Sequence, residues 1–292
     1  MSIPAVSKAR NLIVSTVCRF PLRALDANGP LANQPTWLYR TDTEVTPYER
    51  LAAVLDDLIF FGFSLLVVER GAAGQITKAN WCPMEQWTIT DGRVLVDSKA
   101  VPEDSYLLIN SAFDGLLNIG NRTLRGARDI ENSWVSKVRN PIPLTVLRQE
   151  SGESITELEQ DEITDLLSQW SVARRDKDGA LGFLPAGLQL ETHGLTDPAL
   201  LIEGRNALRT DIGSFLNVPT QMLDGSLSTA SLTYSTQEGT RSKWLDDLQF
   251  WLQPIEARLS MDDAVPRGTR VRFDLTEAYA ALPNPTAAPE AD

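Results

Sequence analysis

Hydrophobic and polar positions alternate in a way that predicts a mixed α+β structure for the first part of the chain. Residues 4–19 are predicted to form a short amphipathic helix, and a second helix follows the capping-box sequence T-P-Y-E (46–49) and ends at Gly62. The intervening residues 26–45 are predicted to be loop. Strand patterns then occur at residues 63–69, 75–80, 85–90, 93–96 and 106–110. Because Asp91-Gly92 is a strong two-residue hairpin signal, we expect a mainly antiparallel sheet.

Two helices flanking a small insert are predicted for the middle of the chain. Residues 123–139 carry apolar side chains along one side of a helix and form the most basic predicted element. The insert, residues 141–196, contains a strand candidate at 143–149, a capping-box helix that follows S-I-T-E (154–157), and short strands in A-L-G-F-L-P-A-G and L-Q-L-E-T-H-G. The insert is therefore predicted to have a β-α-β order.

The helix after the insert begins at Asp197-Pro198, where an N-cap residue precedes a proline. It must end before Pro219, because the residue before a proline is disfavoured in the α conformation. Gly204 and Gly213 lie inside it, and each costs about 1 kcal/mol relative to alanine. A close approach to another helix would compensate for that cost.

A long helix is predicted near the end of the chain, from about residues 231–235 to Met261. Pro254 lies inside its apolar pattern, so we expect a kink near Leu252 or Gln253. Residues 270–275 form a final strand candidate, and residues 283–292 have the composition of a disordered tail.

A hydroxyl-rich segment with almost no charge separates the last two helices. From Val218 to Gln237 the sole charged residue is Asp224. The segment contains neither S-x-x-K nor G-x-S-x-G, which gives little support for a nucleophile there. It is predicted to tether two fixed ends, although its composition alone fits a plain linker equally well.

The composition of the chain does not indicate an active site. The chain has 292 residues, of which 42% are hydrophobic and 23% charged, as in a folded protein. Cys18 and Cys82 fit no metal or disulfide spacing, and one histidine, His193, argues against a zinc site or a Ser-His pair. The 7 tryptophans are interpreted as core or interface anchors, with base stacking as the alternative. No catalytic residue, cofactor or metal is predicted.

The net charge of −12 argues against tight wrapping of nucleic acid, because phosphate neutralisation needs an excess of Lys and Arg. It permits loose contact with DNA that must keep moving. No stretch approaches the roughly 20 apolar residues of a membrane span, so we predict no membrane contact and synthesis in the cytoplasm.

The order of the predicted elements resembles that of the portal proteins of tailed bacteriophages, in the HK97-like family. The segments that carry the resemblance are D-P-A-L-L-I-E-G-R (197–205), D-I-G-S-F-L-N-V-P-T-Q-M-L-D-G (211–225), S-L-T-Y-S-T-Q-E (231–238) and W-L-Q-P-I-E-A-R-L (251–259). F-G-F-S-L-L-V-V-E-R (61–70) fits the corresponding wing segment. Each motif is diffuse alone, but their order is specific.

The resemblance implies an α+β portal fold without a crown domain, since the chain ends soon after its last strand. The implied parts are a wing (1–121), a stem helix (122–140), a clip (141–196), a second stem helix (197–218), a tunnel loop (219–233), the rest of the wing with the kinked helix (234–282) and a disordered tail (283–292).

The resemblance also implies a function without catalysis. Portal subunits form a ring, commonly of twelve copies, at one vertex of the virion head, and double-stranded DNA passes through it during packaging and ejection. The implied partners are the protein itself, the terminase large subunit, the major capsid protein and a head-tail adaptor. A neck or adaptor ring is the alternative, but adaptors are usually smaller and lack the long helix after a tunnel loop.

Candidate site residues follow from the resemblance. The tunnel loop would project toward DNA with Gln221, Met222, Leu223, Asp224, Gly225, Ser226, Leu227, Ser228, Thr229, Ala230 and Ser231. The stem helices would contribute Arg122, Arg125, Arg128, Arg205 and Arg209. The clip would bind partners through Glu157, Glu159, Asp161, Glu162, Asp165, Arg174 and Arg175. The acidic run and the basic helix either complement each other between subunits or are ordinary surface charge.

Overall fold

The structure, a computed structural model, describes residues 3–139, 144–149, 160–173, 188–193, 198–223 and 234–280. The chain divides into two compact units, with unit 1 drawn from residues 1–127 and 206–292 and unit 2 from residues 128–205. Helices α5 (Asn121–Arg139) and α7 (Pro198–Phe215) each contribute residues to both units.

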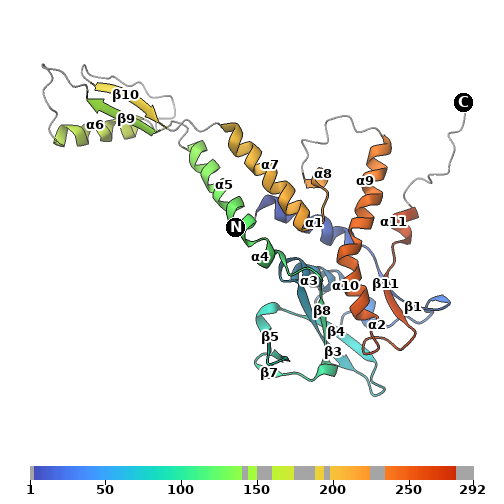
Figure 1. Cartoon of the computed structure of the whole chain (residues 1–292). Helices are drawn as coiled ribbons and strands as arrows, with labels where there is room; N and C mark the ends of the chain where they lie inside the picture. The colour runs from blue at the N-terminus through green and yellow to red at the C-terminus, as the bar shows by residue number, and fades with distance from the viewer. Residues whose placement is uncertain are drawn as a thin grey trace, which may run out of the picture. The chain divides into compact units, whose positions relative to one another are not determined.

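Antiparallel sheets and helices build unit 1 (Figure 1). Its sheets have the orders β4-β3-β8, β5-β6-β7 and β11-β1-β2. The strands are β1 (Leu22–Asp26), β2 (Gly29–Pro30), β3 (Phe63–Arg70), β4 (Ile76–Cys82), β5 (Trp87–Thr90), β6 (Arg93–Val96), β7 (Lys99–Ala100), β8 (Tyr106–Asn110) and β11 (Arg270–Phe273). The helices are α1 (Pro4–Val17), α2 (Thr36–Tyr39), α3 (Pro47–Phe60), α4 (Leu116–Ile119), α8 (Thr220–Leu223), α9 (Tyr234–Asp247), α10 (Gln249–Leu259) and α11 (Thr276–Ala280), with 3₁₀ turns η1 (Met84–Gln86) and η2 (Glu103–Ser105).

Local sequence signals in unit 1 form the structures that they predicted. The Asp91-Gly92 turn joins β5 to β6 with positive φ angles of 51° and 75°, as a tight two-residue hairpin requires. At the start of α3, the Thr46 side chain accepts a hydrogen bond from Glu49 N at 3.2 Å, and Thr46 N donates to Glu49 Oε2 at 2.7 Å. Gly62 ends this helix at φ +87°, and a Cβ atom there would lie 2.3 Å from Phe113 O.

Strand β1, which the hydrophobic pattern did not predict, pairs with β11 (Figure 1). Leu22 lies opposite Phe273, and the following residues form β2 and α2 rather than uninterrupted loop. Side chains at the end of α10 and of the residue that follows it cover the other edge of β11. Glu256 Oε1 accepts a hydrogen bond from Phe273 N at 2.9 Å, and Ser260 Oγ accepts one from Val271 N at 2.9 Å. These bonds satisfy an edge that would otherwise be open for pairing with another strand.

The long helix predicted near the end of the chain is two helices, α9 and α10. The break lies at Leu248, so the prediction of a kink near Leu252 or Gln253 is wrong by about one turn. Pro254 has no N–H to donate to the carbonyl four residues earlier. In the preceding turn, Trp251 N bonds to Leu248 O at 2.9 Å in the tighter 3₁₀ pattern. The helix therefore breaks where this tightened turn begins.

The core of unit 1 buries side chains from α3, α10 and the central sheet, and three charged groups are also buried in this unit. They are Arg50, Glu256 and Asp57, of which Asp57 is 4% exposed. The Asp57 carboxylate accepts hydrogen bonds from Trp81 Nε1 at 2.7 Å and Ser64 Oγ at 2.8 Å. Burial raises the pKa of Asp57 to about 6, although these two hydrogen bonds act in the opposite direction.

Unit 2 contains a two-stranded antiparallel sheet and helix α6 (Gln160–Ala173). Strand β9 (Leu144–Gln149) pairs with β10 (Leu188–His193), with Leu144 opposite His193. The strand, helix, strand order is the one predicted for the insert. The predicted capping box at 154–157 and the strand candidate at 180–187 lie outside the described residues.

Candidate functional site

The two helices predicted to line a channel, α5 and α7, contact each other within unit 2. Gly204 of α7 faces Ile130 of α5, and a Cβ atom at Gly204 would lie 3.4 Å from Ile130 Cδ1. This would be an ordinary van der Waals contact with the end of a side chain, so the close helix approach predicted for Gly204 stays a prediction.

Arg205 holds the two helices together through two contacts. Its Nη2 lies 3.1 Å from Glu131 Oε2, and its guanidinium carbon lies 4.6 Å from the centre of the Trp134 ring. Glu131 and Trp134 are three residues apart and lie on the same side of α5. The Arg205 and Glu131 side chains are 28% and 32% exposed, so the ion pair contributes modestly, and the cation–π contact adds about 0.5–1 kcal/mol.

Gly213, the second glycine of α7, lies too close to its neighbours to carry a side chain. A Cβ atom there would lie 2.8 Å from Val218 O and 2.9 Å from Leu223 Cδ1. Val218 N donates to Gly213 O at 2.9 Å in the same turn. The close neighbours of Gly213 are thus the turn that leaves α7 and Leu223, the last residue of the short helix α8 (Thr220–Leu223).

The start of the predicted tunnel loop is folded onto the core of unit 1. Residues Thr220–Leu223 form helix α8, in which Leu223 is 6% exposed and Met222 is half-buried. Lys8 Nζ also donates to Leu223 O at 3.4 Å. The prediction that Met222 and Leu223 face DNA is therefore wrong, because their apolar side chains pack in the core. The side chain of Gln221 and residues 224–231 lie outside what the structure describes.

The five predicted channel arginines fall into two groups. Arg122, Arg125 and Arg128 are exposed at intervals of three residues on α5, and their guanidinium groups bond to no other described residue. Arg205 is engaged with Glu131 and Trp134, as described above. Arg209 is half-buried and donates to Asn206 Oδ1 at 3.2 Å. The exposed row remains the better candidate for contact with phosphate groups.

Part of the acidic cluster predicted for the insert lies on α6. Asp161, Glu162 and Asp165 are exposed in the first turns of this helix, where negative charge suits the helix dipole. Asp161 and Asp165 are four residues apart and share one face. Glu157, Glu159, Arg174 and Arg175 lie outside the described residues.

The geometry offers charged helix surfaces for binding. Among the residues that the structure describes, no group of three His, Cys, Asp or Glu side chains is arranged to hold a metal ion. A search of the same described ranges finds no helix with the length and apolar character needed to cross a membrane.

Comparison with solved structures identifies the fold. No protein-family model matches the sequence, and no curated protein matches it. The chain matches the crystal structure of an HK97-family phage portal protein from Corynebacterium diphtheriae with a TM-score of 0.79 and 28% identity, over 97% of this chain and 96% of that chain. The chain has the fold of an HK97-family portal protein. The family resemblance seen in the sequence is thereby confirmed.

The portal fold also occurs in gene transfer agent (GTA) particles. The chain matches a protein in the neck of an empty GTA particle, computed with C6 symmetry, with a TM-score of 0.63 and 15% identity over 95% of this chain and 82% of that chain. It matches one in the neck of a native GTA particle, computed with C12 symmetry, with a TM-score of 0.60 and 13% identity over 94% of this chain and 81% of that chain. At these identities the likeness concerns the portal fold alone.

Sequence reasoning missed the partners of Arg205 in this portal fold. Trp134 is one of the tryptophans interpreted as core or interface anchors, and the sequence contains no separate signal for Glu131. The i, i+3 spacing of Glu131 and Trp134 was a usable signal. Choosing their partner on α7 required the relative register of the two helices, which sequence periodicity does not contain.

Proposed function

We propose that the protein is a phage portal, which forms a homo-oligomeric ring at one vertex of the virion head. The observation that carries the proposal is the match to an HK97-family portal protein over 97% of the chain at a TM-score of 0.79. In this role the protein conducts double-stranded DNA during packaging and ejection and performs no catalysis. A ring of twelve copies is proposed, and the neck of a native GTA particle computed with C12 symmetry supports this number.

The parts of the structure take the following roles in the proposal. The wing comprises residues 1–121 and 234–282 of unit 1, and the α5 and α7 regions, 122–140 and 197–218, are the stem. Residues 141–196 are the clip, residues 219–233 the tunnel loop and residues 283–292 a tail. Because α8 anchors residues 220–223 to unit 1, the part of the tunnel loop that faces DNA begins at Asp224.

Charge supports a channel that lets DNA slide. The chain carries a net charge of −12, which opposes strong retention of a polyanion. Arg122, Arg125 and Arg128 are exposed on one helix and provide limited contact with phosphates. We propose that DNA is held weakly and in a salt-dependent way, since each neutralised phosphate releases counterions.

The clip is proposed to dock the terminase large subunit first and a head-tail adaptor afterwards. The exposed carboxylates of Asp161, Glu162 and Asp165 support a partner surface with positive charge. The wing is proposed to contact the major capsid protein. A cyclic ring also requires heterologous contacts, in which one face of a subunit matches a different face of the next.

Electron microscopy tests the ring directly. We expect the purified protein, or the particle that contains it, to show closed rings with a central channel. A protein that stays monomeric at high concentration, together with particles that lack such a ring, would refute the portal function.

A deletion of residues 224–231 tests the tunnel loop. Helix α8 is left intact, so we expect rings to assemble normally while DNA packaging or retention fails. The matched control replaces the same residues with an equally long Gly-Ser linker, which separates the loss of chain length from the loss of side chains. If the deletion prevents ring assembly, the segment is a subunit interface instead.

A neck or adaptor ring is the second candidate, because two of the structures that share the fold come from particle necks. The two functions differ in the order of assembly. Loss of a portal prevents DNA packaging, whereas loss of an adaptor leaves filled heads without tails. Heads that are filled with DNA in the absence of this protein would favour the adaptor.

A further inference from the structure

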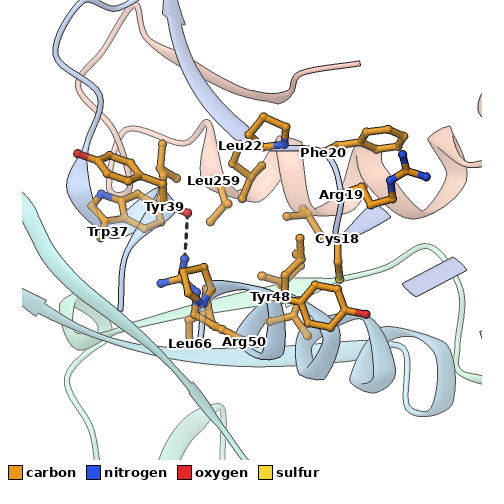
Figure 2. Close-up of a pocket in the computed structure, with 17 residues that line it drawn as sticks. Cys18, Arg19, Phe20, Leu22, Trp37, Tyr39, Tyr48, Arg50, Leu66 and Leu259 are labelled. Carbon is orange, nitrogen blue, oxygen red and sulfur yellow. Dashed lines mark hydrogen bonds between the residues drawn. The ribbon is translucent and has the colours of Figure 1, made fainter. Parts of the chain in front are cut away.

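A cavity of about 260 Å³ opens in unit 1 between the α1–β1 connection, α2, α3 and α10. Figure 2 shows Trp37 and Tyr39 on one side of it and Phe20 and Tyr48 on the other. Tyr39 is 48% exposed and Tyr48 is 51% exposed, so both rings remain accessible to an occupant. Apolar openings lined by aromatic side chains are typical binding sites for other chemical groups.

Arg50 gives this cavity a buried positive charge. It is 7% exposed, and its guanidinium donates to Ala79 O at 2.8 Å and to Leu38 O at 3.0 Å. Figure 2 shows Arg50 among the residues that line the cavity. Within the described part of the chain, Arg50 bonds to no carboxylate. Burial lowers the pKa of Arg50 to about 10. The other charged side chain that lines the cavity, Arg19, is also basic. The cavity therefore fits an apolar segment that carries negative charge.

A segment of this chemistry begins close to the cavity. Asp274 N donates to Pro21 O at 2.8 Å, and Phe273 lies opposite Leu22, where Pro21 and Leu22 both line the cavity. Helix α11 then ends at Ala280, after about 7.5 Å of helix. Residues 281–292, which lie outside the described residues, would span about 37 Å at about 3.1 Å per residue in an extended proline-rich conformation. They are long enough to return to the cavity.

The composition of residues 281–292, ALPNPTAAPEAD, matches the cavity. The segment contains Leu282 and three prolines, and its charged residues, Glu290 and Asp292, are both acidic. Proline-rich segments bind aromatic-lined grooves because they lose little conformational freedom on binding. We propose that residues 281–292 occupy this cavity in the same chain, with residues 282–285 against the aromatic rings and the carboxylates directed toward Arg19 and Arg50.

The reactivity of Cys18 tests the proposal, because this half-buried thiol lines the cavity. A segment docked in the cavity would cover this thiol further, so alkylation by a maleimide should be slower in the intact protein than in a variant whose segment is displaced. We expect a full-length variant carrying Leu282→Asp, Pro283→Gly and Pro285→Gly to be alkylated at Cys18 several-fold faster. A matched variant with Ala287→Ser and Ala288→Ser should keep the slow rate. An unchanged rate in the triple variant overturns the proposal.

A disulfide identifies which chain supplies the segment. In a full-length Leu282→Cys variant under mild oxidation, we expect the introduced thiol to form a disulfide with Cys18 of the same chain. Mass spectrometry detects this bond, and adding Cys18→Ser should abolish it. A bond that joins two chains overturns the assignment to the same chain and points to the neighbouring subunit. Both measurements are chemical and depend on neither DNA packaging nor virion assembly, so they can fail or succeed independently of the portal function.

Discussion

Replacing Gly213 with alanine should destabilise unit 1, although alanine is the better helix former. The added methyl group would meet Val218 O at 2.8 Å and Leu223 Cδ1 at 2.9 Å. The oxygen is backbone in a turn that is already fixed by the bond from Val218 N to Gly213 O at 2.9 Å. The turn cannot move away without weakening this bond.

The magnitude follows from three contributions. Overpacking in a tight site costs about 1–3 kcal/mol. Loss of the turn hydrogen bond costs about 1 kcal/mol. The higher helix propensity of alanine stabilises the helix by about 1 kcal/mol relative to glycine. The net loss for Gly213→Ala is therefore about 1–3 kcal/mol of unfolding free energy.

Gly126→Ala is the matched control, because a Cβ atom at this position of α5 meets nothing within 4 Å. The same chemical change should there stabilise the helix by about 1 kcal/mol. Urea unfolding followed by circular dichroism and tryptophan fluorescence measures both variants. The reasoning is refuted if Gly213→Ala is as stable as the wild-type protein, or if the two variants shift stability in the same direction.

Three further predictions concern the charged groups. The pKa of Asp57 is raised to about 6 from an ordinary value near 4, so between these pH values the folded protein holds a proton that the unfolded chain has released. The free energy of unfolding therefore falls as pH rises through this window. Asp57→Asn should flatten this slope in urea titrations, and an unchanged slope would contradict the assignment. Arg205→Ala should destabilise unit 2 by about 1 kcal/mol. A double-mutant cycle with Trp134→Ala should give a coupling free energy of about 0.5–1 kcal/mol, and zero coupling would argue against the stacked contact. Glu256→Ala should lower the free energy of unfolding by about 2 kcal/mol, because it leaves Phe273 N buried without its acceptor. Hydrogen exchange at that amide should accelerate. An amide that stays protected would show that another group replaces the carboxylate.

Signals that act within a few residues were sufficient to predict much of the fold. Asp91-Gly92 and the Thr46–Glu49 pair determine their own local geometry, and the structure contains both as predicted. The exposed arginines on α5 could also be placed, because helical spacing alone puts them on one surface.

Features that depend on distant partners could not be predicted in the same way. β1 becomes a strand because β11 lies beside it, although the two are far apart in sequence. Leu223 lies in a hydroxyl-rich segment and is buried because Gly213 and the core leave space for it. Pro254 predicted a distortion but not the turn that absorbs it, since this depends on how α10 packs. In each case the deciding contact lies outside the local pattern.

The pairing of β1 with β11 has a consequence for synthesis on the ribosome. Residues 22–25 cannot find their partners until residues 270–273 have emerged, so this sheet closes only after most of the chain has been translated. Unit 2, which is continuous in sequence, is free to fold earlier. A chain that terminates prematurely lacks β11 and leaves the edge of β1 unpaired. Incomplete translation products therefore cannot complete the β11-β1-β2 sheet of unit 1.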